Sequence, residues 1–167
     1  MRLLFRQLTL DDSESFHEWL SDYEVIKYSQ GKFLRPYSNG QIKDWLKAIL
    51  VDCKSVNFAI TLADTNKIIG YAGIADLSEI NHSGEFYILI GDKTQWNKGY
   101  GQEVSRAIVD YGFRVLMLHR IQLTVSNINI GGVVAYKKAG FVEEGVLRDA
   151  SYRDGSYHDK IIMSIIK

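Results

Sequence analysis

The 167-residue sequence is poor in residues that cross-link or interrupt a chain, with one cysteine, one proline and no excess of either charge. Because Cys53 has no partner, an internal disulfide is excluded, which is typical of a reducing cytosol. We expect Cys53 to be a buried bystander. The single proline, Pro36, argues against a flexible linker, so residues 1–167 are predicted to form one domain.

The charge balance excludes several classes of partner. Twenty basic and twenty acidic residues cancel, so no net field draws the protein toward nucleic acid or a membrane. Basic pairs such as Lys137-Lys138 are too small for a nucleic-acid surface. The longest apolar runs are far shorter than a membrane span. We therefore expect a cytoplasmic protein that binds neither.

Hydrophobic periodicity predicts seven strands and four helices. The strands are expected near 3–8, 58–62, 68–74, 86–90, 121–125, 141–148 and 157–166. The helices are expected after a Thr9–Asp12 capping box, around 42–50, after Gly101, and from about 129 to 139, closed by Gly140. In the third helix the predicted buried stripe is Val104, Ala107, Ile108, Tyr111 and Val115. Residues 30–39 read as a loop. The fold class is α+β, a mixed and mostly antiparallel sheet with helices on both faces.

The stretch 95-QWNKGYGQEVSRAIVDYGF-113 places Gly99 and Gly101 directly before the third helix. A helix N-terminus offers unpaired backbone N–H groups and partial positive charge, and glycines let phosphate oxygens approach it closely. The P-loop is excluded because no Gly-Lys-[Ser/Thr] occurs, and the dinucleotide fingerprint fails because residue 104 is Val. Taken alone, the motif predicts either a phosphate site or a simple turn.

Further stretches carry a resemblance to a known family. With the glycine turn, 68-IIGYAGI-74, 81-NHSGEFYILIG-91, 129-NIGGVVAYKKAGF-141 and 144-EGVLRDASYRDGSYHDKIIM-163 resemble the GNAT N-acetyltransferases. The similarity runs nearly end to end. It is strongest to the branch that includes ribosomal-protein N-terminal acetyltransferases and spermidine N-acetyltransferases.

The resemblance implies acetyl-CoA as acetyl donor and no metal. It implies that the backbone amides of Lys98, Gly99, Tyr100, Gly101 and Gln102 hold the diphosphate. Trp96 stands where the broader family carries Gln or Arg. The strand end Ile88, Leu89 and Ile90 would pair with the pantetheine arm, and a backbone N–H near Ile88 or Leu89 would be the oxyanion donor. Asn129 would orient the cofactor or the local loop.

The resemblance also implies a general acid, Tyr136, which protonates the departing thiolate, and a base, Glu85, with His82 as an alternative. Each has another interpretation. Tyr136 would otherwise be a core residue of its helix, and Glu85 a salt-bridge partner at a strand end. Gly131 and Gly132 either permit close approach of the cofactor or indicate a helix that begins one turn later.

The acceptor is left open among a polyamine, a peptide N-terminus and an amino sugar on a nucleotide carrier. An acidic cluster of Glu18, Asp22 and Glu24 would suit a polyamine, but such clusters also serve solubility. The partner is thus a small-molecule amine or a peptide N-terminus. A homodimer and a longer acyl donor also stay open. The alternative function is a non-catalytic acyl-CoA sensor with the same fold.

Overall fold

The computed structural model describes residues 2–29 and 37–167, so most of the predicted loop at 30–39 lies outside the described residues. The strands are β1 (Leu3–Gln7), β2 (Val56–Leu62), β3 (Ile68–Ser78), β4 (Ser83–Ile90), β5 (Arg120–Ser126), β6 (Val142–Arg153) and β7 (Ser156–Ile166). The helices are α1 (Ser13–Leu20), α2 (Tyr23–Ile26), α3 (Asn39–Val51), α4 (Tyr100–Arg114) and α5 (Ile130–Ala139). The strands form one sheet in the order β1-β2-β3-β4-β5-β7-β6, which confirms the predicted mixed α+β class.

The chain divides into two compact units, residues 1–73 with 88–96, and residues 74–87 with 97–167. In the first unit β1 and β2 pair antiparallel, with Leu3 opposite Leu62. Their core is aromatic: the Phe16 ring lies 5.2 Å from the ring of Trp45 and 5.0 Å from that of Tyr71, edge to face. Such pairs add to the stabilisation that burial alone provides.

The predicted capping box of Thr9 and Asp12 is present at the short 3₁₀ turn η1 (Leu10–Asp12), which leads into α1. The Thr9 N–H donates to the Asp12 carboxylate at 2.8 Å, and Arg6 donates to it with both terminal nitrogens. Burial alone would raise the pKa of Asp12, but these hydrogen bonds outweigh it and lower the pKa. The carboxylate therefore joins β1 to the start of α1.

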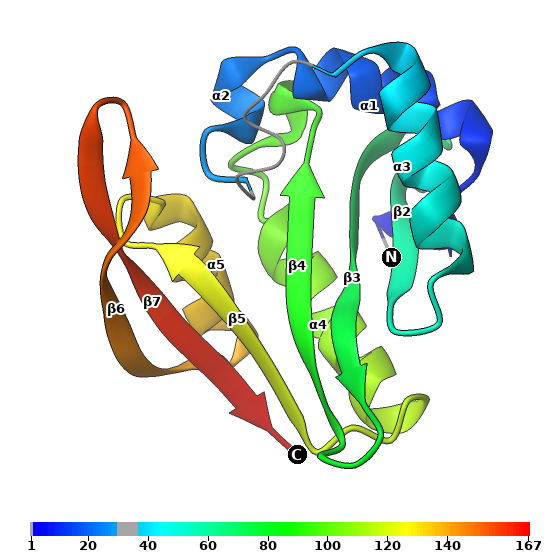
Figure 1. Cartoon of the computed structure of the whole chain (residues 1–167). Coiled ribbons are helices and arrows are strands. Elements are labelled where there is room, and N and C mark those ends of the chain that lie inside the picture. Colours follow the sequence, from blue (N-terminus) through cyan, green and yellow to red (C-terminus); the bar gives the residue numbers. More distant parts are fainter. Residues whose placement is uncertain (1, 30–36) are drawn as a thin grey trace. The chain divides into compact units, whose positions relative to one another are not determined.

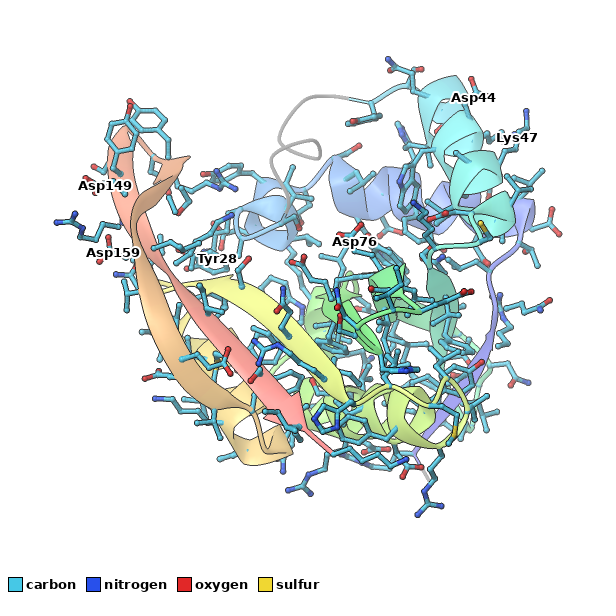
Figure 2. All side chains as sticks on the ribbon, turned by 60° about the horizontal axis from the view of Figure 1, so that its bottom comes forward. Tyr28, Asp44, Lys47, Asp76, Asp149 and Asp159 are labelled. Carbon is cyan, nitrogen blue, oxygen red and sulfur yellow. The ribbon has the colours of Figure 1, made fainter. Side chains whose placement is uncertain are left out.

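In the second unit β5, β7 and β6 lie side by side, with β6 at the edge (Figure 1). The β6–β7 hairpin turns at Asp154-Gly155, where both φ angles are positive at 50° and 79°, as a type I′ turn requires. A bulge between Leu147 and Ser151 interrupts β6. There the Asp149 N–H donates to the Asp159 carboxylate at 2.9 Å, and both residues are labelled on the hairpin in Figure 2.

Two predictions of burial are wrong. Val115 is 60% exposed, because α4 ends at Arg114 and its buried positions are Val104, Ser105, Ile108, Val109 and Gly112. Cys53 is exposed, since it lies in the turn between α3 and β2 rather than on a packed face. Neither residue contributes to a core.

Candidate active site

The glycine turn forms the N-terminus of α4. Gly99 is the N-cap residue with a left-handed φ of 82°, and as a glycine it makes no side-chain cap hydrogen bond. The first intrahelical bond runs from the Glu103 N–H to the Gly99 carbonyl, so the amides of Tyr100, Gly101 and Gln102 precede it. These amides and the helix dipole suit an anion. Lys98 stands exposed just before them.

Gly101 has no steric reason to be glycine within the described fold. A Cβ built on it would lie 3.6 Å from the Ala135 Cβ, an ordinary contact, and its φ is not left-handed. Glycine in a helix is less favourable than alanine by up to about 1 kcal/mol. The described fold therefore does not require glycine at this position, and the small residue is compatible with close approach of a phosphate to the α4 amides.

The side chain of Gln102 has a structural role. Its amide nitrogen donates to the Lys138 carbonyl at 3.3 Å, and Arg106 donates to the same carbonyl at 2.7 Å. Both bonds tie α4 to the last turn of α5. Of Gln102, only the backbone N–H therefore stands at the predicted phosphate site.

Asn129 is the N-cap of α5. Its side-chain oxygen accepts from the Gly132 N–H at 3.1 Å, so the helix begins at Ile130 and the later start is wrong. A Cβ at Gly132 would lie 2.7 Å from the Asn129 amide nitrogen, whereas one at Gly131 would meet nothing within 4 Å. The cap therefore accounts for Gly132, and Gly131 borders open space.

Tyr136 packs against the sheet through an aromatic cluster. Its ring lies 6.0 Å from that of Phe86 on β4 and 6.1 Å from that of Phe141, which follows α5. Both phenylalanines are buried, while the Tyr136 side chain is half-buried. Burial raises the pKa of the Tyr136 hydroxyl to about 12, so this hydroxyl keeps its proton at neutral pH.

Glu85 lies on the opposite face of β4 from Tyr136, because successive strand residues point to opposite faces and Phe86 contacts Tyr136. Glu85 is half-buried. Burial raises its carboxyl pKa, the nearby Asp76 raises it further, and Lys160 lowers it, with a net upward shift. A raised pKa makes this carboxylate a better proton acceptor near neutral pH. The alternative of a strand-end salt bridge gains no support, since no ion pair to Glu85 occurs within residues 2–29 and 37–167.

The parallel pairing of β4 and β5 is short. It joins Ser83–Glu85 to Arg120–Gln122, whereas β5 continues to Ser126 in register with β7. Beyond Glu85 and Gln122 the two strands are not paired. Glu85 therefore stands at the point where β4 and β5 part.

His82, the alternative base, lies three residues before Glu85 with a left-handed φ of 46°. Its carbonyl accepts from the N–H groups of His119 and Arg120, at 2.6 and 3.1 Å. Its side chain is exposed. The backbone of His82 thus closes the turn before β4. Of the two candidate bases, Glu85 is the one that is partly desolvated.

In the first unit the end of β4 is fixed by Trp96. The Trp96 indole nitrogen donates to the Ile90 carbonyl at 2.8 Å. A Cβ on Gly70 would lie 2.2 Å from the Leu89 carbonyl oxygen, so β3 packs closely against this segment. Ile88, Leu89 and Ile90 are half-buried, and the hydrogen bond from Trp96 fixes the backbone at Ile90.

Two members of the predicted acidic cluster, Asp22 and Glu24, form ion pairs with lysines. Asp22 forms an ion pair with Lys93 and accepts from the Glu24 N–H at 3.0 Å. Glu24 pairs with Lys27 at 2.8 Å. These carboxylates have local cations, which weakens the case for a polyamine subsite there.

Sequence reasoning missed Asp76 and Lys160, the two charged groups that act on Glu85. Strand alternation could have placed Lys160 on a polar face. No sequence pattern indicated that Lys160 lies near Glu85, because the two residues are far apart in the chain.

Within residues 2–29 and 37–167 no group of three or more His, Cys, Asp or Glu side chains is arranged to hold a metal. In the same part of the chain no helix has the length and apolar character to cross a membrane.

In the second unit, α4 follows a glycine turn, β4 and β5 part after Glu85, and Tyr136 packs against Phe86 of β4. The family model described as Acetyltransferase (GNAT) domain matches residues 2–142. The chain therefore belongs to the GNAT acetyltransferases and is an N-acetyltransferase.

Several individual proteins within this family are similar to the chain in sequence or structure. A spermidine N(1)-acetyltransferase of Escherichia coli K12 is 36% identical over 166 residues, 97% of this chain and 84% of that protein. The crystal structure of spermidine N-acetyltransferase from Vibrio cholerae in complex with CoA and spermine matches with a TM-score of 0.89 and 28% identity, covering 99% of this chain and 95% of that one. A putative ribosomal N-acetyltransferase of Bacillus subtilis is 27% identical over 60% of this chain and 54% of that protein.

Proposed function

We propose that this N-acetyltransferase moves the acetyl group of acetyl-CoA directly onto a primary amine, with no covalent enzyme intermediate. The observation that carries the proposal is the placement of Glu85 and Tyr136 on opposite faces of β4, at the point where β4 and β5 part. A base on one face and an acid on the other suit a single reacting centre between them.

The cofactor site in this proposal is the N-terminus of α4. The amides of Lys98, Gly99, Tyr100, Gly101 and Gln102 hold the diphosphate. The bound cofactor supplies an activated acetyl thioester. Two observations support this assignment: the described fold has no steric need for glycine at position 101, and the N-cap Gly99 makes no side-chain hydrogen bond to the α4 amides. The CoA bound in the Vibrio relative supports it as well.

In the first unit, we assign the end of β4 to the pantetheine arm of the cofactor. The backbone of Ile88, Leu89 and Ile90 pairs with the pantetheine arm and offers an N–H to the developing oxyanion. Trp96 holds this segment through the Ile90 carbonyl. Asn129 acts indirectly, because its cap sets the start of the helix that carries Tyr136.

The two catalytic residues divide the proton transfers. Glu85 takes a proton from the attacking amine, directly or through water, because an ordinary amine with a pKa near 10 is mostly charged at neutral pH. Tyr136 gives its proton to the departing thiolate. With its pKa raised to about 12, the Tyr136 hydroxyl is protonated before each turnover. After it has donated its proton, it takes up another proton from solvent.

The acceptor is a primary amine, either a small molecule or a peptide N-terminus. Spermidine acetyltransferases among the relatives support a small-molecule amine. The putative ribosomal acetyltransferase supports a peptide. An amino sugar is a third possible acceptor, beside a polyamine and a peptide N-terminus.

The proposal is tested by measuring thiol release from acetyl-CoA against a panel of amines, together with calorimetric binding of CoA. Tyr136→Phe is expected to lower kcat by about a hundredfold or more with little change in CoA affinity. Tyr152→Phe, an exposed tyrosine of β6, is the matched control. An unchanged rate in Tyr136→Phe would remove the general acid, and CoA binding without turnover of any amine would favour the sensor.

A further inference from the structure

One face of the second unit carries Glu85 together with polar residues of β5 and β7, and we call it the acceptor face. Glu85 is in register with Gln122 on β5, and Ser126 of β5 is in register with Lys160 on β7. Paired residues point to the same side, and so do residues two or four apart along a strand. Glu85, Gln122, Ser126 and Lys160 therefore share this face, opposite Tyr136.

Ser126 ends β5 with an unused hydroxyl. The residue is 9% exposed, and within residues 2–29 and 37–167 its Oγ has no hydrogen-bond partner. A buried hydroxyl is nearly always satisfied, so one without a partner in the protein points to a ligand or water. It lies four residues beyond Gln122, about 13 Å along the strand at 3.3 Å per residue.

Lys160 is the second group of the acceptor face without a protein partner. It is half-buried, and in the described part of the chain its ammonium makes no hydrogen bond or ion pair. Its charge nevertheless acts on Glu85. A partly desolvated ammonium that makes no direct ion pair favours a negative ligand.

The acceptor face is thus acidic at the Glu85 end, where Arg120 is already paired with Glu144, and basic at the Ser126 end. Asp76, labelled in Figure 2, and Glu85 supply the acidic end, and Lys160 with Ser126 supplies the basic end. An ammonium group suits the first and an anionic oxygen group the second.

We propose, building on the function proposed above, that the acceptor is an amine that also carries an acidic oxygen group, a carboxylate or a phosphate, which Lys160 and Ser126 bind. The amine is held at Glu85, and the acid lies further along β5. A polyamine would instead bring a second ammonium toward Lys160. Asp22 and Glu24, the acidic residues that the sequence offered for a polyamine, already pair with lysines within the first unit.

The experiment compares three acceptors of one length, 6-aminohexanoate, 6-aminohexyl phosphate and 1,6-diaminohexane, at saturating acetyl-CoA. The wild-type kcat/KM is expected to be higher for at least one of the two acidic amines than for the diamine, by roughly ten- to a hundredfold. The preferred acid separates a carboxylate from a phosphate acceptor.

Variants test whether Lys160 and Ser126 cause the preference for an acidic amine over the diamine. Lys160→Glu is expected to reverse the preference and Lys160→Met to remove it. Ser126→Ala is expected to raise KM for the preferred acid more than for the diamine. Lys47→Glu, an equal change of charge on α3 (Figure 2), is the control and should leave the ratio unchanged. If Lys160→Glu does not fold, as judged by circular dichroism, Lys160→Met carries the test.

Two results overturn the inference alone: a wild-type enzyme that prefers the diamine or shows no preference, and a Lys160 variant whose ratio equals that of the wild type. Failure of every amine to react, although CoA binds, overturns the proposed function and this inference together. The two failures are therefore distinguishable.

Discussion

Gly101→Ala should change stability and cofactor affinity in opposite directions. The added Cβ makes an ordinary contact with Ala135 at 3.6 Å, so the fold tolerates it. Alanine is favoured over glycine in a helix by about 0.5–1 kcal/mol. For a domain of this size, that gain corresponds to a rise in Tm of roughly 1–4 °C.

The same methyl group stands where a phosphate oxygen is expected to approach the α4 amides. Loss of one charge-assisted hydrogen bond costs about 1.5–3 kcal/mol, or roughly a ten- to hundredfold rise in Kd. Gly101→Val should weaken binding at least as much. Thermal unfolding and calorimetric titration with CoA measure the two effects on one preparation.

Gly40→Ala is the matched control. Gly40 is also the second residue of a helix, α3, and its Cβ would lie 3.8 Å from the Ser38 hydroxyl. Alanine there should stabilise to a similar extent and leave CoA affinity unchanged. A more stable Gly101→Ala protein that binds CoA as tightly as the wild type would refute the diphosphate site at α4.

Two further predictions concern Glu85, the proposed base, and Asn129, the N-cap of α5. Glu85 must be deprotonated to act, so kcat/KM falls as pH drops through its raised pKa. Asp76→Asn removes a charge that raises this pKa and should move the acid limb to lower pH. Lys160→Met removes a charge that lowers it and should move the limb to higher pH. Equal or same-direction shifts in the pH–rate profiles would contradict Glu85 as the titrating base. Asn129→Ala should lower the free energy of unfolding by about 1 kcal/mol through loss of the α5 cap. Gly132→Ala should destabilise the wild type by displacing that cap but stabilise Asn129→Ala, as a denaturant double-mutant cycle can measure; additive effects would show that the two residues are not coupled.

Most of the fold was predictable because its signals are local. Alternation located β5 through Ile121, Leu123 and Val125, all buried as expected. Asp154-Gly155 located the hairpin turn, although β6 and β7 run closer to it than predicted. Val115 was misassigned because helical periodicity continues past the residue at which α4 ends.

Sequence motifs proposed the members of the candidate site but could not give their arrangement. Motif spacing named Tyr136 and Glu85, whereas their placement on opposite faces follows from the contact between Phe86 and Tyr136. The effects of Asp76 and Lys160 on Glu85 depend on strand order and register, which no local pattern encodes. The pairing of Asp22 with Lys93 is likewise a long-range contact.

The exposed Cys53 has a practical consequence for enzymology on this protein. It is the chain's sole cysteine, and it is open to solvent. Disulfide reagents that report released coenzyme will also titrate the enzyme, giving a background of one equivalent per chain. Cys53→Ser would remove that background, and the native residue offers a unique attachment point for a spectroscopic label.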